Sequence, residues 1–190
     1  QGLRDVGGVK AGQRVLINGA AGGVGTYAVQ IAKLFGAHVT AVCSGRNVEM
    51  VRSLGADEVI DYTTTDVSDL GMTFDVIFDN AGSQSASKLA RLLEPEGIAV
   101  VVTGPKKGKV IGPVGHIVRS KLRFMFGSRR GGIMNAVTRR SDLEQIGTWV
   151  ADGSITPVIH QTFSPAATSW AILSRSSSLA SMSIQWVSSI

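Results

Sequence analysis

The chain has 190 residues, which is enough for one large domain or for one domain with an appendage. Its single cysteine, Cys43, excludes an internal disulfide, and no apolar run approaches the length of a membrane span, so we expect no membrane partner. The net charge of +5 lies partly in basic pairs without interleaved aromatic residues, which indicates solvated loops and not a nucleic-acid surface; the pairs are Lys106-Lys107, Arg129-Arg130 and Arg139-Arg140.

Strand-like and helix-like segments alternate along the chain. Apolar runs predict strands near residues 13–18, 38–43, 57–61, 74–79, 97–103 and 121–126. Helical spacing of apolar residues predicts helices near 23–36, 46–54, 84–93 and 140–152. This alternation predicts an α/β fold of the Rossmann type: a doubly wound parallel sheet of about six strands in the order 3-2-1-4-5-6, with helices on both faces.

Other stretches lack these patterns. Pro95-Glu96-Gly97 predicts a turn ahead of the fifth strand, and residues 104–118 and 127–139 have the composition of Gly- and Arg/Lys-rich connections. Residues 164–190 are crowded with serine, which weakens helix formation. We therefore expect a dinucleotide-binding domain over residues 1–156 and a C-terminal segment with an atypical tail over residues 157–190.

The glycine-rich turn between the first strand and the first helix has the features of a phosphate site. Gly22 would let the backbone approach a pyrophosphate, Gly25 would let the helix pack closely on the strand, and free N–H groups at the helix start would face the anion. Two registers fit, one typical of Rossmann domains and one of short-chain dehydrogenases: Ala20-x-Gly22-x-x-Gly25 and Gly19-x-x-x-Gly23-x-Gly25. The second family needs a catalytic Tyr-x-x-x-Lys, and neither tyrosine of the sequence is followed by that lysine.

The stretch after the second strand indicates which nicotinamide cofactor the domain would take. NAD-binding folds place an acidic residue there for the ribose hydroxyls, whereas this chain has no acid from Val42 until Glu49. Ser44 offers a small donor and Arg46 a planar cation that suits a phosphate, which favours NADP over NAD. Alternatively, Ser44 merely caps the next helix and Arg46 is a solvated first-turn residue. Tyr62 could lie beside the adenosine or close the core.

The sequence shows no catalytic set and no metal site. The three histidines, His38, His116 and His160, are far apart and make no ligand spacing, so we expect no metal. We nominate no catalytic residue, because the chain shows neither a Ser-His-Asp set nor a carboxylate pair with an acid/base arrangement. Cys43 lies in an apolar run and is expected in the core.

Five stretches together resemble the cofactor domain of the medium-chain dehydrogenase/reductases and, within them, the zinc-independent quinone oxidoreductase branch. They are GQRVLI (12–17), GAAGGVG (19–25), VRSLGADEVIDY (51–62), FDVIFD (74–79) and LEPEG (93–97). The resemblance covers about residues 1–163. It implies NADPH-dependent reduction of a quinone, an enone or a similar activated carbonyl compound.

The resemblance also implies roles for individual residues. It assigns pyrophosphate contacts to Ala21, Gly22, Gly23 and Val24, adenosine and 2′-phosphate contacts to Ser44, Arg46 and Tyr62, a ribose contact to Asn80, and the nicotinamide side to Thr103 and Gly104. The predicted sixth strand carries Phe124 and Phe126, and in this family that strand often pairs across a homodimer. Core or edge packing is the alternative for both phenylalanines.

The sequence departs from the family in two ways. It has no counterpart of the N-terminal catalytic domain with a GroES-like barrel, and residues 164–190 do not match the closing strand that returns to that domain, although Trp170–Leu173 resembles the last helix. We therefore expect the cofactor-binding part of a cytoplasmic oxidoreductase, inactive by itself. The alternatives are a zinc-dependent alcohol dehydrogenase with its ligands on the missing part, a nucleotide-binding protein without turnover, and an RNA-binding protein that uses the positive charge.

Overall fold

The structure is a computed structural model that describes residues 1–82, 84–102, 130–134, 137–160 and 162. By its internal contacts the chain divides after Thr156. The fold below is that of the part before this division. None of the helices within the described residues is long and apolar enough to cross a membrane.

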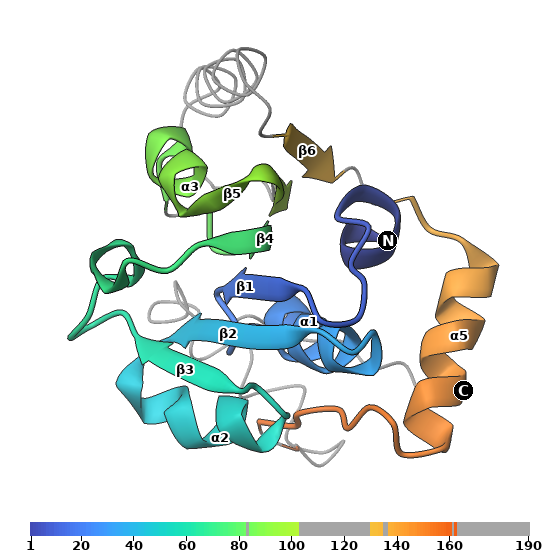
Figure 1. Cartoon of the computed structure of the whole chain (residues 1–190). Helices are drawn as coiled ribbons and strands as arrows, with labels where there is room; N and C mark the ends of the chain where they lie inside the picture. The colour runs from blue at the N-terminus through green and yellow to red at the C-terminus, as the bar shows by residue number, and fades with distance from the viewer. Residues whose placement is uncertain (83, 103–129, 135–136, 161, 163–190) are drawn as a thin grey trace, which may run out of the picture. The chain divides into compact units, whose positions relative to one another are not determined.

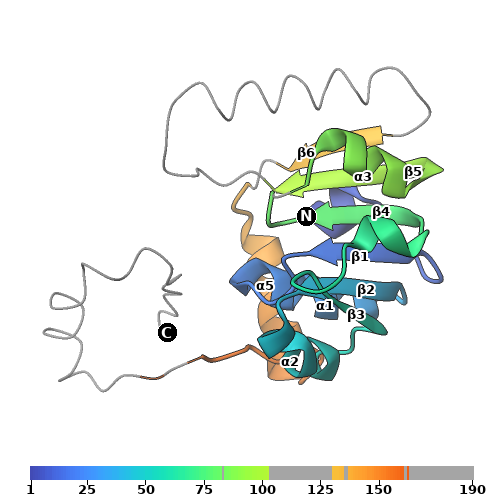
Figure 2. The same cartoon turned by 90° about the vertical axis from the view of Figure 1, so that its left-hand side faces the viewer.

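Six parallel strands form one sheet in the order β3-β2-β1-β4-β5-β6, and Figure 2 shows them stacked from β6 at the top to β3 at the bottom. Their bounds are β1 Arg14–Asn18, β2 His38–Cys43, β3 Glu58–Asp61, β4 Phe74–Asp79, β5 Leu93–Val102 and β6 Arg130–Met134. The strand order reverses between β1 and β4, which is the switch point where open α/β sheets bind ligands. The predicted doubly wound Rossmann-type sheet is confirmed.

The helices lie where helical spacing predicts them (Figure 1). They are α1 Gly23–Leu34, α2 Val48–Ser53, α3 Ala86–Leu92 and α5 Arg140–Ala151, together with the short helical turns η1 Gly2–Val6, η2 Gly45–Asn47 and η3 Val67–Leu70. The predicted second helix is divided into η2 and α2. The other three agree with the prediction to within one to two residues at each end.

Alternation along the strands builds two apolar layers, one on each face of the sheet. Val15 and Ile17 of β1 belong to a cluster with residues of α1 and α2, whereas Leu16 between them belongs to a cluster with residues of α3 and η3. Because successive side chains of a strand point to opposite faces, this is the arrangement that a strand covered on both sides requires. Cys43 is buried in the first cluster, as predicted.

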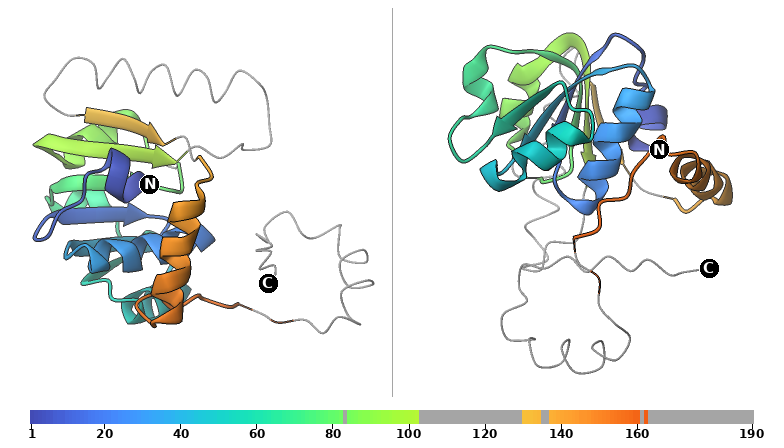
Figure 3. Two further views of the ribbon diagram at one scale, coloured as in Figure 1. Left: turned by 90° about the vertical axis from the view of Figure 1, so that its right-hand side faces the viewer. Right: turned by 90° about the horizontal axis from the view of Figure 1, so that it is seen from below.

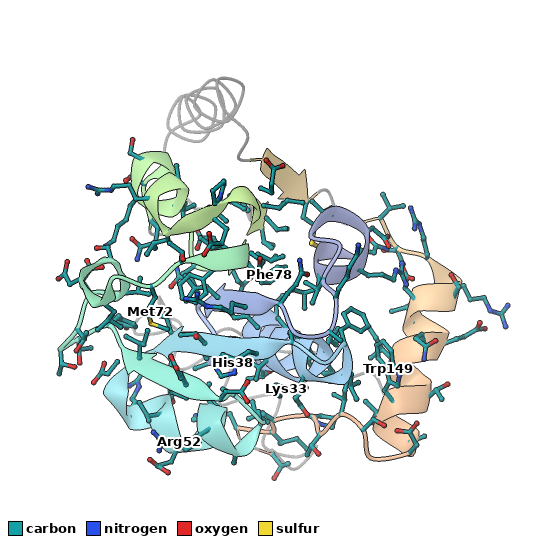
Figure 4. All side chains as sticks on the ribbon, in the orientation of Figure 1. Lys33, His38, Arg52, Met72, Phe78 and Trp149 are labelled. Carbon is teal, nitrogen blue, oxygen red and sulfur yellow. The ribbon has the colours of Figure 1, made fainter. Side chains whose placement is uncertain are left out.

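Helix α5 lies beside α1 (Figure 3). Trp149 of α5, which is labelled in Figure 4, meets the ring of Phe35 edge to face, and the ring centroids are 6.4 Å apart. At the other end of α5, Arg4 of η1 pairs with Asp142 at 3.0 Å, so the N-terminal turn and the last described helix are tied together.

Two sequence expectations differ from the structure. The predicted turn Pro95-Glu96-Gly97 lies within β5, where the pairing with β4 shifts register between Phe74 and Val76. The sixth strand predicted at 121–126, with Phe124 and Phe126, lies outside the described residues. The strand that pairs with β5 is Arg130–Met134, inside the stretch 127–139 that was expected to be a connection, so that expectation is wrong.

The position of β6 has a physical reason. A Cβ at Gly132 would overlap a methyl group of Val6, so glycine is needed where the N-terminal turn packs on this strand. A strand with glycines at such a contact has no continuous apolar run, which is the signal on which the sequence prediction depended.

Candidate cofactor-binding site

The turn after β1 carries the first group of candidate residues. The N–H groups of Gly19 and Ala20 donate to the carbonyl oxygen of Val42 at 3.1 and 3.0 Å, which fixes the turn to β2. Gly19 has a φ of +80°, in the left-handed region that favours glycine. The N–H of Gly22 then donates to the carbonyl oxygen of Gly19 at 3.1 Å, and α1 begins at Gly23.

The start of α1 presents unbonded backbone donors. No side chain caps the helix, and the N–H groups of Gly23, Val24 and Gly25 have no hydrogen-bond partner within the described part of the chain. The first N–H groups of a helix lack intrahelical acceptors and carry the positive end of the helix dipole. This end of α1 is therefore suited to an anion.

Gly25 and Gly22 differ in the space around them. A Cβ at Gly25 would overlap the carbonyl oxygen of Gly19 and lie 2.8 Å from Cα of Ala20, so the close contact that Gly25 allows is with the turn after β1 and not with the strand itself. Gly22 is exposed and extended, with φ −78° and ψ 165°, and a Cβ there would meet the Gly19 oxygen at 3.4 Å and Nδ2 of Asn80 at 3.6 Å, which are ordinary contacts. The fold thus has room for a Cβ at Gly22.

Exposure of the neighbouring residues agrees with an open turn. Ala21 and Gly23 are half-buried, and the side chain of Val24 is 51% exposed although its spacing along the sequence fits the apolar face of α1. Val24 therefore lies at the helix start beside the unbonded donors and outside the core.

The second group of candidates follows β2 and β3. Arg46 is exposed and has no hydrogen-bond or ion-pair partner among the residues whose placement is described. Ser44 occupies the cap position before η2 but makes no side-chain cap; its Oγ accepts a hydrogen bond from Nδ2 of Asn47 at 3.0 Å, which leaves its own O–H free to donate. Tyr62 is 62% exposed, so the alternative that it closes the core is wrong.

Sequence reasoning missed Asp61, the last residue of β3. In the sheet it stands opposite Cys43, the last residue of β2, and so beside the Ser44–Arg46 turn. Hydrogen bonds from the backbone and hydroxyl of Thr63, and from the backbone of Gly45, lower the pKa of Asp61. The carboxylate therefore holds the two turns together. Asp61 lies far from Ser44 in the sequence, and only the register of β3 with β2 brings it beside the turn that follows β2.

Of the three remaining candidate residues, the structure describes Asn80 but not Thr103 or Gly104. Asn80 follows β4, donates its N–H to the carbonyl oxygen of Asn18 at 3.1 Å, and places its side chain beside Gly22. The structure thus brings Asn80 together with the glycine turn. Thr103 and Gly104 lie outside the described residues. Burial raises the pKa of the Cys43 thiol, which makes it a packed residue and not a nucleophile.

No metal centre is found within the described ranges, where no three or more His, Cys, Asp or Glu side chains gather. The candidates described above are therefore backbone donors, one unpaired cation, hydroxyls and an amide. A doubly wound parallel sheet with such groups at its switch point defines a dinucleotide-binding domain of the Rossmann type.

Comparisons with known proteins place this domain. A family model described as zinc-binding dehydrogenase matches residues 23–151. Trans-enoyl reductase pgmF of Aspergillus terreus is 36% identical over 164 residues, which cover 80% of this chain and 45% of that protein. The chloroplast envelope quinone oxidoreductase homolog of Arabidopsis thaliana is 34% identical over 163 residues, covering 83% of this chain and 47% of that protein.

A solved structure of a quinone oxidoreductase agrees with these sequence matches. The quinone oxidoreductase from Coxiella burnetii superposes with a TM-score of 0.72 at 28% identity, covering 92% of this chain and 52% of that one. The chain belongs to the zinc-binding dehydrogenase family of the medium-chain dehydrogenase/reductases, in its quinone-oxidoreductase-like branch. It spans about half the length of the curated relatives that it matches over most of its own length.

Proposed function

We propose that this chain is the cofactor-binding part of an NADPH-dependent oxidoreductase that reduces a quinone, an enone or a similar activated carbonyl compound. Two separate sets of donors carry the proposal. The first is the unbonded N–H groups at the start of α1, and the second is Ser44 and Arg46 after β2, where Arg46 has no partner among the described residues. A pyrophosphate needs the first group and a 2′-phosphate the second.

The names of the relatives support this reaction class. They include a quinone oxidoreductase homolog, a trans-enoyl reductase and, at 50% identity over 95 residues, the mitochondrial NAD(P)H oxidoreductase RTN4IP1 of Mus musculus, of which the match covers 24% of that protein and 48% of this chain. All three names describe a reductase or oxidoreductase. The preference for NADPH over NADH and the substrate are proposals that go beyond these names.

The residues of this chain would bind and orient the cofactor. Ala21, Gly22, Gly23 and Val24 would receive the pyrophosphate; Ser44, Arg46 and Tyr62 would surround the 2′-phosphate and adenosine; Asn80 would lie at the ribose. When bound, the nicotinamide supplies a hydride to a carbon made electron-poor by conjugation. The carboxylate of Asp61 is already bonded to Gly45 and Thr63, so it remains beside the 2′-phosphate position as a fixed negative charge that Arg46 must offset.

The substrate wall of the site would come from the part of the relatives that this chain does not match. In the proposal residues 1–156 form the cofactor domain, and residues 157–190 return toward that other part. Pairing of a homodimer through the sixth strand and a cytoplasmic location are also proposed; the names of two relatives place those proteins in mitochondria and in the chloroplast envelope.

A titration of the chain with NADPH and NADH, combined with a turnover assay, tests the proposal. We expect NADPH to bind the more tightly of the two, and NADPH oxidation with a panel of small quinones and enones to be negligible, because water at the open nicotinamide side weakens activation of the carbonyl. A longer chain that includes the N-terminal part of the relatives should turn over. Tighter binding of NADH, or no binding of either nucleotide, would contradict the proposal.

A further inference from the structure

A buried polar pair lies beneath the glycine turn. Nδ2 of Asn18, the last residue of β1, donates to Oδ1 of Asp79, the last residue of β4, at 2.8 Å. The two residues face each other in the strand register and are 5% and 1% exposed. Burying a carboxyl group costs free energy unless hydrogen bonds offset the lost hydration, so its presence at the switch point needs a reason.

The same oxygen of Asp79 also fixes the loop that follows β4. It accepts the N–H of Gly82 at 2.9 Å, and Gly82 has a φ of +59°, in the left-handed region. At the start of this loop, the N–H of Asn80 donates to the carbonyl oxygen of Asn18. One carboxyl oxygen therefore joins the end of β1 to Gly82, while a backbone hydrogen bond joins β1 to Asn80 at the other end of the loop 80–82.

This loop packs directly against the glycine turn. A Cβ at Gly19 would lie 3.2 Å from both the Cβ and the backbone nitrogen of Ala81, and the side chain of Asn80 lies beside Gly22. Because Gly19 and Ala81 are packed too tightly for a Cβ to fit between them without a small shift, movement of the loop would move the turn that presents the N–H groups of α1. The carboxyl group is thus connected to the pyrophosphate side of the candidate site without contacting it.

We propose that Asp79 is a positioning residue for the dinucleotide, which holds the glycine turn and Asn80 in the arrangement that the pyrophosphate and the adjoining ribose require. The proposal rests on the proposed function. Oδ1 of Asp79 accepts hydrogen bonds from both Asn18 and Gly82, so one atom fixes two donors at once. The adenosine end, with Ser44 and Arg46, lies after β2, which is separated from β4 by β1 in the sheet, and within the described structure neither residue is hydrogen-bonded to Asn18 or Asp79.

The test compares two probes on the same variants of the full chain. NADPH spans both ends of the site, whereas adenosine 2′-monophosphate reaches only the adenosine end. Asp79→Ala should weaken NADPH about tenfold or more, because two buried donors lose their acceptor, and leave adenosine 2′-monophosphate unchanged. Asp79→Asn, which keeps an oxygen for both donors, should recover most of the NADPH affinity.

Thr40→Val is the matched control. Thr40 is 1% exposed in β2 and carries a polar group away from the turn, so this variant should lose stability without a selective loss of NADPH. If Asp79→Ala does not fold, Asn18→Ala takes its place, since it keeps the bond between Asp79 and Gly82, and the same selective loss is expected in a milder form.

Three results would overturn the inference. Equal weakening of both probes in a folded Asp79→Ala protein would mean a general structural role. Unchanged NADPH affinity in folded Asp79→Ala, or in folded Asn18→Ala if it is used instead, would mean that the pair does not position the turn. Failure of the unaltered chain to bind either probe would overturn the proposed function and this inference with it, whereas intact binding of both probes by the unaltered chain isolates the role of Asp79.

Discussion

The two edges of the sheet, where the strands begin and where they end, differ in how their charged groups are paired. We call them the amino edge and the carboxyl edge. At the amino edge, Lys33 pairs with Asp57 at 2.8 Å, with His38 close by (Figure 4), and the N–H of Arg14 donates to Asp75 at 2.8 Å. Charged groups at this edge are satisfied by one another and by the chain.

At the carboxyl edge, Asp61 and Asp79 accept hydrogen bonds from backbone donors, and one cation has no partner among the described residues. Asp61 binds the turns that follow β2 and β3, Asp79 binds the loop that follows β4, and Arg46 has no partner in the described part of the chain. Arg52, six residues along, pairs with Glu49. The difference indicates that the ion pair of the amino edge contributes to stability, whereas Asp61 and Asp79 of the carboxyl edge fix loop geometry and leave unbonded donors where we propose that the cofactor binds.

The largest expected effect is on folding at the carboxyl edge. Gly25→Ala places a methyl group on the carbonyl oxygen of Gly19, so we expect a loss of about 3 kcal/mol in the free energy of unfolding. Gly147→Ala in α5 is the matched control, because a Cβ there meets nothing within 4 Å; it should gain about 0.5–1 kcal/mol. Urea unfolding of both variants checks this, and equal stabilities would refute the close packing of the turn.

Gly22→Val should abolish binding and leave the fold intact. Gly22 has extended backbone angles that valine also adopts, and a Cβ there has only ordinary contacts, so the new side chain occupies the approach of the pyrophosphate and little else. We expect at least a hundredfold loss of NADPH affinity, about 3 kcal/mol, with an unchanged circular dichroism spectrum. Retained affinity in the folded variant would reject the phosphate turn.

Arg46→Ala tests whether the unpaired cation reads the 2′-phosphate. A hydrogen bond to a charged group contributes about 1.5–3 kcal/mol, so NADPH should weaken by about one to two decades while NADH changes little. Arg52→Ala is the control, since it removes the same charge from a residue that is already paired with Glu49. Ser44→Asp should weaken NADPH further than Arg46→Ala. Equal loss of both nucleotides in Arg46→Ala would exclude Arg46 as the phosphate reader.

The sequence predicted what depends on local pattern. Strands β1 to β4 agree with their predicted bounds to within one residue, because alternation and apolar runs are properties of a few neighbouring residues. The glycine turn was found for the same reason: Gly22 and Gly25 are close together in the chain. The turn residue Ser44 was placed correctly, but whether it capped η2 through its side chain had to be read from the structure.

What the sequence did not predict depends on long-range contacts. β6 forms where Gly132 packs against the side chain of Val6, and these two residues are far apart in the chain. Asp61 reaches the turn after β2 only through the register of β3, and Asp79 meets Asn18 only through the pairing of β1 with β4. No periodicity along the chain carries such information, since it arises when the sheet assembles.

The smallest effect is expected at the amino edge. Burial alone would raise the pKa of Asp57, but hydrogen bonds from Lys33 and from the backbone of Val39 bring it below its ordinary value of 3.8. A carboxyl group with a lowered pKa in the folded state stabilises the fold above its ordinary pKa, and this contribution is lost as the pH falls through that value toward the lower folded one. Lys33→Met should therefore cost about 0.5–1 kcal/mol at neutral pH.

That cost should shrink as the solution is acidified below about pH 4, where Asp57 takes up a proton and the unaltered chain loses the pair that Lys33→Met already lacks. Urea midpoints of the unaltered chain and of Lys33→Met, measured across the acid range, check the sign. Lys10→Met, which removes an exposed lysine whose side chain has no partner among the described residues, is the control for net charge and should show no such convergence. NADPH affinity should be the same in all three proteins, because the amino edge lies at the opposite end of the strands from the proposed cofactor site. A drop confined to Lys33→Met would mean that the two edges are coupled.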